Sequence, residues 1–211
     1  MLIDIFHDTA CPWCRIGKKH LFDALSAVGQ SQTVDIRWHP FLLDDSIPAQ
    51  GVGFRSFMKT RKGIGAQRLE QLFSYATQSA AKAGVKLDFD KVLLAVNTTL
   101  SHRLITLTPK DYKNVMVEAI YKAYFEDGLN IGDVDTLVRL GKNFGLDESK
   151  LKQQLSGDAA LTEVMTEAKA ARERGMNSVP FFIINNKISI SGSQSVDTFI
   201  QAMQPEFSAS L

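Results

Sequence analysis

The chain has 211 residues, of which 45% are hydrophobic and 22% are charged, and its formal net charge at pH 7 is +1. This composition is typical of a globular protein that buries a substantial core. The nearly neutral charge argues against a nucleic-acid-binding surface, which is normally clearly basic. The sequence contains no run of 18 nonpolar residues, so it predicts no membrane-spanning helix.

The first predicted elements are a strand over residues 2–7, where nonpolar and polar residues alternate, and a helix over residues 12–28. The only two cysteines of the chain, Cys11 and Cys14, lie where the strand gives way to the helix. A helix N-terminus offers unpaired N–H groups and the positive end of the helix dipole, which favour Cys11 as a thiolate. Cys14 is expected one turn deeper, as the resolving thiol. Pro12 suits the first helical turn, where its missing N–H has no partner.

The spacing of the cysteines predicts a redox-active dithiol. A zinc site is the main alternative, but structural zinc needs four ligands, usually from a second CxxC or a pair of closely spaced histidines. No two of the four histidines have that spacing, and the sequence therefore predicts no metal. These histidines are His7, His20, His39 and His102.

Next in the chain, residues 34–38 alternate as a second strand, which should run parallel to the first with a right-handed crossover. The pattern changes at about residue 41: residues 44–53 resemble a loop, and helical periodicity then dominates up to residue 174. Thr108 and Pro109 are predicted to be the N-cap and first residue of a helix, and Asp133 another N-cap. The helices are predicted over residues 69–83, 92–107, 109–125, 133–145, 148–155 and 158–174.

Strand character returns near the end of the chain, where residues 181–184 and 188–191 predict a hairpin with a turn at residues 185–186. Pro180 precedes the first of these strands; a proline belongs at a strand's start and can adopt a cis peptide bond. A final helix is predicted over residues 196–203.

Five segments share features with one known family: residues 8–17 (DTACPWCRIG), 38–43 (WHPFLL), 97–103 (NTTLSHR), 175–184 (GMNSVPFFII) and 190–194 (ISGSQ). Together they resemble the DsbA family of thioredoxin-fold proteins, and within it the cytoplasmic FrnE-like branch. The resemblance implies an α/β, thioredoxin-like fold with a central mixed sheet flanked by helices. Residues 1–40 and 175–211 would form this domain, and residues 41–174 an all-helical insertion.

The resemblance also implies a chemistry: thiol–disulfide exchange, through a mixed disulfide at Cys11 that Cys14 resolves. The other expected site residues share a place beside this dithiol. Pro12 and Trp13 would tune its redox potential, although Trp13 is alternatively a simple exposed aromatic at a helix start. Substrate would be bound by Val179, Pro180 as the cis-proline, His102 and Asn97, although the last two are alternatively solvated residues that cap a helix.

His7 and Asp8 precede the motif and lie either near the thiols or at the surface. A carboxylate there would raise the pKa of a nearby thiol, whereas an imidazolium would lower it.

No resident cofactor is expected, with glutathione or another thiol as the co-substrate. Partners would be protein or small-molecule thiols and disulfides, with no nucleic acid and no membrane. We expect a cytoplasmic enzyme, monomeric or homodimeric, with disulfide isomerase activity as an extension of the same chemistry.

Two other functions stay open. One is a glutathione-dependent isomerase or transferase of the 2-hydroxychromene-2-carboxylate isomerase or kappa type, acting on a small molecule; the presence of Cys14 argues against it. The other is a chaperone-like holdase whose cysteines only regulate binding.

Overall fold

The computed structural model describes residues 1–29 and 34–208. The sequence also predicts a turn at residues 29–32 between the first helix and the second strand; most of it lies outside the described residues, as do the last three residues of the chain. Within the described part of the chain, no helix is long and nonpolar enough to cross a membrane.

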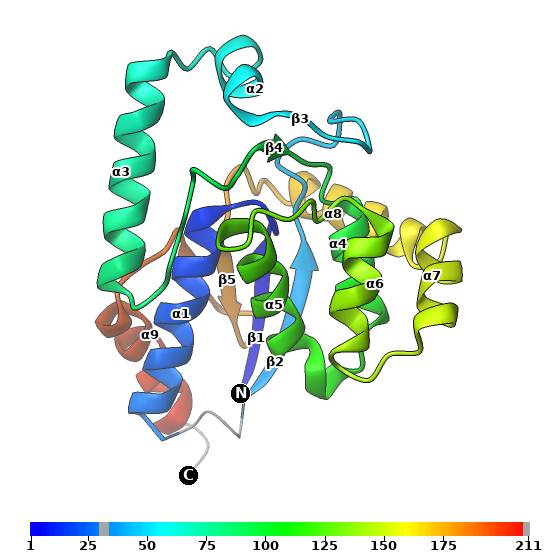
Figure 1. The fold of residues 1–211 in the computed structure, drawn as a ribbon. Helices are drawn as coiled ribbons and strands as arrows, with labels where there is room; N and C mark the ends of the chain where they lie inside the picture. Colours follow the sequence, from blue (N-terminus) through cyan, green and yellow to red (C-terminus); the bar gives the residue numbers. More distant parts are fainter. Residues whose placement is uncertain (30–33, 209–211) are drawn as a thin grey trace.

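A four-stranded mixed sheet forms the centre of the molecule, with strand order β2-β1-β5-β6 (Figure 1). Strand β1 (Leu2–His7) runs parallel to β2 (Asp35–Pro40) and antiparallel to β5 (Phe181–Ile184), which pairs with β6 (Ile188–Ser191). Chain ends that lie far apart in sequence therefore become neighbouring strands. This sheet confirms the predicted thioredoxin-like α/β fold.

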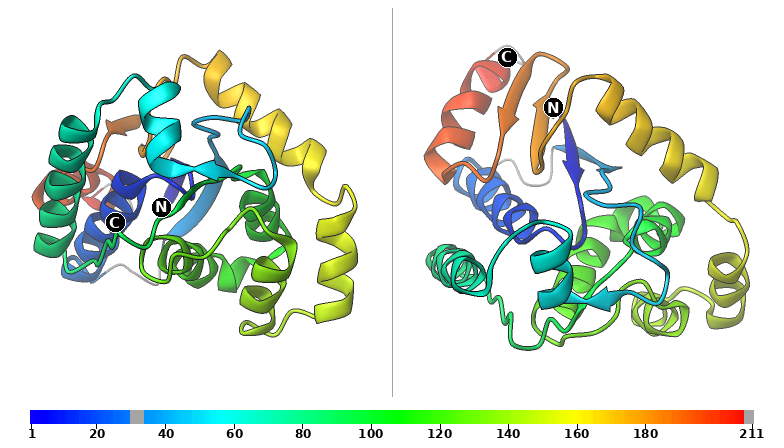
Figure 2. Two further views of the ribbon diagram at one scale, coloured as in Figure 1. Left: turned by 45° about the horizontal axis from the view of Figure 1, so that its top comes forward. Right: turned by 90° about the horizontal axis from the view of Figure 1, so that it is seen from above.

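Helices cover both faces of the sheet. Helix α1 (Pro12–Ala27) packs against α9 (Val196–Ser208) on one face, and α8 (Leu161–Glu173) covers the other (Figure 2). Helix α5 (Lys113–Phe125) packs against α1. A cluster of buried nonpolar side chains joins the sheet to these helices. The division at residues 40 and 175 into two domains stays a prediction.

The middle of the chain is mostly helical, as predicted, but it also contains a small second sheet. Its two strands, β3 (Val52–Gly53) and β4 (Leu94–Ala95), are antiparallel. The expected all-helical insertion therefore gains a strand pair: β3 falls in the predicted loop, and at β4 the hydrogen bonds to a distant segment outweigh the local helical pattern. The remaining elements are α2 (Phe54–Thr60), α3 (Ala66–Lys82), α4 (Thr99–Leu107), the 3₁₀ helix η1 (Lys110–Tyr112), α6 (Val134–Lys142) and α7 (Glu148–Ser156).

The helix predicted over residues 92–107 is wrong in its first half. Residues 92–98 hold β4 and irregular backbone, and the helix begins only at Thr99, whose N–H donates to Asn97 Oδ1 at 3.0 Å. The predicted cap at Thr108 is also wrong, because its Oγ1 donates back to the Leu104 carbonyl at 2.7 Å and closes α4 instead. Pro109 accordingly precedes η1 rather than opening an α-helix.

Two predictions that depend only on neighbouring residues are confirmed, the helix cap at Asp133 and the turn at residues 185–186. Asp133 caps α6 by accepting the Thr136 N–H at 2.8 Å. Asn185 and Asn186 adopt φ values of 48° and 57° and form the predicted hairpin turn.

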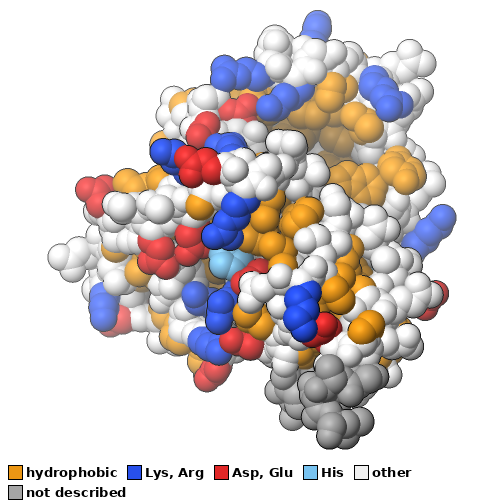
Figure 3. Space-filling view, turned by 180° about the vertical axis from the view of Figure 1, so that it is seen from behind, with side chains coloured by type: hydrophobic (Ala, Val, Ile, Leu, Met, Phe, Trp, Pro, Cys, Tyr) orange, Lys and Arg blue, Asp and Glu red, His pale blue; other side chains and the backbone are white. Residues whose placement is uncertain are grey.

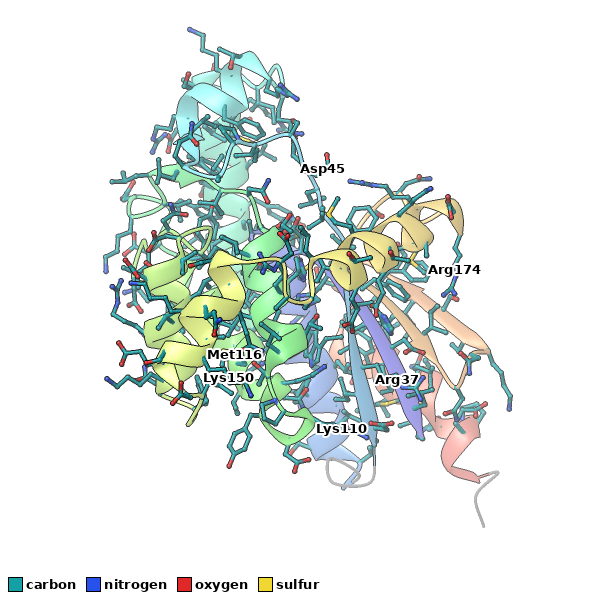
Figure 4. The ribbon with its side chains drawn as sticks, turned by 90° about the vertical axis from the view of Figure 1, so that its right-hand side faces the viewer. Arg37, Asp45, Lys110, Met116, Lys150 and Arg174 are labelled. Carbon is teal, nitrogen blue, oxygen red and sulfur yellow. The ribbon has the colours of Figure 1, made fainter. Side chains whose placement is uncertain are left out.

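An ion pair and a hydrogen bond hold the segment between β2 and α2 against α8. Asp45 lies on this segment (Figure 4), and its carboxylate is 3.6 Å from Arg172 Nη1 of α8. Arg172 also donates to the Leu42 carbonyl and lies over the Phe41 ring. Helix α8 therefore holds the chain where it leaves the sheet.

Candidate active site

The two cysteines lie at the start of α1, as predicted. Cys11 is the N-cap residue, and Cys14 lies one turn further along. Both thiols are free, and the residues are only 4% and 2% exposed, respectively. The Cys14 N–H donates to the Cys11 carbonyl at 3.2 Å, and the Cys11 N–H to the Asp8 carbonyl at 3.1 Å. This tight turn brings the two sulfur atoms together.

The segment before β5 faces the dithiol, as the resemblance implied. The Val179 carbonyl lies 3.8 Å from Cys11 Sγ, within the range of a weak S–H hydrogen bond, and the Val179–Pro180 peptide bond is cis. Gly17 of α1 permits this approach. A Cβ added there would lie 2.9 Å from Pro180 Cγ and 3.2 Å from the Phe182 ring.

The two thiols differ in their surroundings. Burial raises the pKa of Cys14 well above its usual value, and the neighbouring Cys11 sulfur raises it further. The Asp8 carboxylate also contributes to this increase. Cys14 therefore stays protonated while Cys11 is unmodified.

The buried carboxyl group of Asp8 accepts hydrogen bonds from backbone N–H groups. Its oxygens accept the N–H groups of Ala10 at 2.9 Å and Leu43 at 2.7 Å, and it also interacts with Thr98. Burial nevertheless outweighs these bonds and raises its pKa to about 6. Of the two options that the sequence left open, the structure shows Asp8 near the thiols.

Behind the dithiol lies a set of buried polar side chains that we call the polar layer. His7 Nδ1 and the Tyr121 hydroxyl are 2.7 Å apart, and the His7 and His102 rings lie 5.0 Å apart. Burial lowers the pKa of His7 well below its usual value and that of His102 to about 3, so both rings are neutral. The polar layer consists of His7, Asp8, Thr9, Ser101, His102 and Tyr121.

On its other side, the dithiol borders a cavity of about 510 Å³. Cys11, Pro12, Trp13 and Val179 form one wall, whereas Cys14 does not line it. Nonpolar side chains of α2 and α3 form much of the remainder, and such side chains gather around the hollow below α2 at the top of Figure 3. These include Phe54, Phe57, Met58, Leu69, Leu72 and Phe73.

Trp13 lies at the edge of this cavity and is partly buried. Its ring centroid is 5.4 Å from that of Tyr75, an exposed residue of α3. The indole thus bridges the dithiol and the α3 helix.

Two of the predicted substrate-binding residues lie away from the cavity. His102 is buried in the polar layer. The Asn97 side chain donates to the Ile47 carbonyl at 2.8 Å and accepts the Thr99 N–H, so it braces the start of α4. Neither lines the cavity: the His102 ring packs against His7 of β1, and Asn97 is held by contacts within the insertion.

The sequence analysis missed the phenylalanines of α2. Phe54 and Phe57 lie between Gly53 and Gly63, and the helical spacing of the nonpolar residues in the stretch FRSFM (residues 54–58) was a usable signal there. No group of three His, Cys, Asp or Glu residues in the described ranges is arranged to hold a metal ion.

The sheet, the helices and the dithiol define a thioredoxin-fold protein with a CxxC motif. The family model for the DSBA-like thioredoxin domain matches residues 2–204, and the chain belongs to this family.

Several solved structures share this fold. The probable DsbA oxidoreductase SCO1869 from Streptomyces coelicolor is 25% identical, with a TM-score of 0.90 over 99% of this chain and 90% of that one. A 2-hydroxychromene-2-carboxylate isomerase is 18% identical, with a TM-score of 0.73 over 100% and 98%. The cytosolic disulfide reductase DsbM from Pseudomonas aeruginosa, solved with GSH, is 16% identical, with a TM-score of 0.69 over 99% and 100%.

Proposed function

We propose that this protein is a thiol–disulfide oxidoreductase that uses Cys11 and Cys14. The observation that carries the proposal is the asymmetry of the two thiols: Cys11 lines the cavity beside Val179, and Cys14 is enclosed behind it. A nucleophilic thiol must meet the substrate, whereas a resolving thiol needs to meet only its partner.

In the reductive direction, the Cys11 thiolate attacks one sulfur of a substrate disulfide and releases the other as a thiolate. Cys14 then attacks Cys11 Sγ, releases the second thiol and leaves the Cys11–Cys14 disulfide. The interaction with Cys11 raises the pKa of Cys14. Formation of the mixed disulfide removes the Cys11 charge, so Cys14 becomes easier to deprotonate when it is needed.

The neighbouring residues would support these steps. Pro12 and Trp13 would tune the redox potential, and the backbone at Val179 and Pro180 would orient the substrate sulfur against Cys11. The reverse reactions oxidise substrate thiols, and exchange in both directions gives disulfide isomerase activity.

Glutathione is our proposed co-substrate, with no resident cofactor, and we propose the FrnE-like branch and a cytoplasmic location. The similarity to a cytosolic disulfide reductase solved with GSH supports this choice. The structure-level similarity to SCO1869 supports the oxidoreductase class.

A second candidate function is a glutathione-dependent isomerase or transferase acting on a small molecule. It is favoured by the nonpolar cavity next to Cys11 and by the similar fold of the 2-hydroxychromene-2-carboxylate isomerase. Such a reaction would need no second thiol, so full activity of a Cys14→Ala variant with glutathione conjugates would establish it.

The deciding experiment is equilibration of the protein with a glutathione redox buffer, followed by alkylation of free thiols and mass measurement. We expect a reversible Cys11–Cys14 disulfide, and a Cys14→Ser variant that accumulates a glutathione adduct at Cys11. A potential near about −120 mV would indicate a disulfide donor, and one near about −270 mV a reductase. The absence of any reversible disulfide would contradict the proposal.

A further inference from the structure

Some of the nonpolar side chains around the cavity have no place in the core. Helix α2 has no buried residue, although Phe57 and Met58 both face the cavity. Ile64 and Leu72 line it as well, and all four are only partly buried. None of the four belongs to the cluster of side chains that forms or packs against the hydrophobic core.

Such side chains contribute little to folding, because burial stabilises a nonpolar group only when something removes it from water. Four of them around one hollow form an unfilled nonpolar surface. The cavity volume of about 510 Å³ lies within the range of small-molecule sites.

The rim of the cavity is polar and closed on one side. Lys62 follows α2, and its Nζ lies 2.9 Å from Asp44 Oδ2 on the loop after β2. Lys62 also lies over the Phe57 ring, 5.3 Å from its centroid. This ion pair therefore links the residues that follow α2 to the loop that follows β2, at the edge of the cavity.

Cys11 is reached from this cavity. Its side chain is almost fully buried, and the groups around it include Pro12, Trp13 and Val179, which line the same hollow. A substrate disulfide at Cys11 therefore places one of its two substituents among the side chains of α2 and α3.

We infer that this cavity binds the nonpolar substituent of a low-molecular-weight disulfide, aromatic or branched aliphatic, and so makes such molecules the preferred substrates. The inference rests on the proposed function and adds a substrate class to it. A polypeptide substrate fits the site less well, because two chain arms would have to leave the cavity past α2 and the Asp44–Lys62 pair.

The test uses two mixed disulfides that share one half: benzyl 2-hydroxyethyl disulfide and methyl 2-hydroxyethyl disulfide. Reduced protein converts each to two free thiols, and the two electrons come from formation of the Cys11–Cys14 disulfide. The second-order rate constant of this oxidation is measured for each probe. The benzyl-to-methyl ratio of these rate constants is divided by the ratio measured with dithiothreitol, which corrects for the intrinsic reactivity of the probes.

We expect the corrected benzyl-to-methyl ratio to be about tenfold or more, as burial of a phenyl group implies. Phe57→Asp should lower this ratio at least fivefold, and Ile64→Ser should lower it as well. Ser56→Asp is the charge-matched control, because Ser56 is exposed on the same helix and does not line the cavity. It should change neither rate constant.

A corrected ratio near one in the unaltered protein would overturn the inference, as would a ratio that Phe57→Asp leaves unchanged. Faster reaction with insulin disulfides than with the benzyl probe would also overturn it. In each of these cases the protein still exchanges disulfides, so the proposed function survives. If neither probe oxidises the reduced protein but glutathione disulfide does, the inference fails and the proposed function survives; if glutathione disulfide also fails to oxidise it, the proposed function itself fails.

Discussion

The two sides of the dithiol differ in packing and in polarity. The polar layer on one side is filled, and its His7, Tyr121, Thr9 and Ser101 side chains bond to one another in pairs. The cavity on the other side is lined mostly by nonpolar side chains and is unfilled, and Asp8 is the member of the polar layer that also lines it. Burial on the packed side raises the pKa of Cys14, whereas the hollow side determines what reaches Cys11. Changes on the packed side should therefore alter stability, and changes on the cavity side should alter substrate choice.

The largest expected effect comes from the contact between α1 and Pro180. A side chain at position 17 would collide with Pro180, Phe182 and the Ser193 backbone. We expect Gly17→Val to lower the free energy of unfolding by about 3 kcal/mol, the cost of overpacking a rigid site. Urea denaturation measures this change.

Gly65→Val is its control, because a Cβ at Gly65 meets no atom within 4 Å. Loss of glycine at the N-cap of α3 should cost less than about 1 kcal/mol. Equal destabilisation by the two variants would show that the α1–Pro180 contact is not tightly packed.

The next effect depends on pH and concerns Asp8. Its pKa of about 6 lies above the usual value of 3.8, so the folded protein holds this proton more tightly than the unfolded chain. The resulting stabilisation is complete below about pH 4 and is lost as the pH rises through 6. Asp8→Asn does not titrate, so its unfolding free energy relative to the unaltered protein should rise by about 2 kcal/mol between pH 4 and pH 8.

Urea denaturation at several pH values gives this difference. Asparagine keeps only one of the two acceptor oxygens, but that loss is the same at every pH. A difference that is flat between pH 4 and pH 8 would contradict the raised pKa of Asp8.

A smaller effect is expected for the hydrogen bond between Tyr121 and His7. Tyr121→Phe removes the hydroxyl group and leaves His7 Nδ1 buried without its partner. The free energy of unfolding should fall by about 1 kcal/mol. Tyr112→Phe is the control, since Tyr112 is exposed and should change nothing measurable. An unchanged stability in Tyr121→Phe would show that the polar layer adapts to the loss.

The smallest effect is expected on the cavity side, at the aromatic pair of Trp13 and Tyr75. Tyr75 is 63% exposed, so Tyr75→Ala should change stability by no more than about 0.5 kcal/mol. The loss of the neighbouring ring should expose Trp13 and shift its fluorescence to longer wavelength. Recording the shift in a Trp38→Phe background isolates the signal of Trp13. A large loss of stability in Tyr75→Ala would show that the cavity side contributes to stability as the packed side does.

The sequence by itself determined the features that depend on neighbours within a few residues. The dithiol at a strand–helix junction, the Asp133 cap and the Asn185–Asn186 turn all follow from local backbone preferences and spacing. The family resemblance added the pairing of Cys11 with the Val179–Pro180 segment, which is separated from it by 168 residues.

Only the tertiary structure decided where the other site residues lie. Asp8 is held by the N–H of Leu43, 35 residues away, and His102 contacts His7 across the boundary of the predicted insertion. Helical spacing of nonpolar residues predicts that a phenylalanine in the insertion packs in the core, yet Phe57 faces the cavity. A nonpolar residue at helical spacing looks the same in a sequence whether it packs against protein or lines a hollow, because the difference lies in what other elements place opposite it.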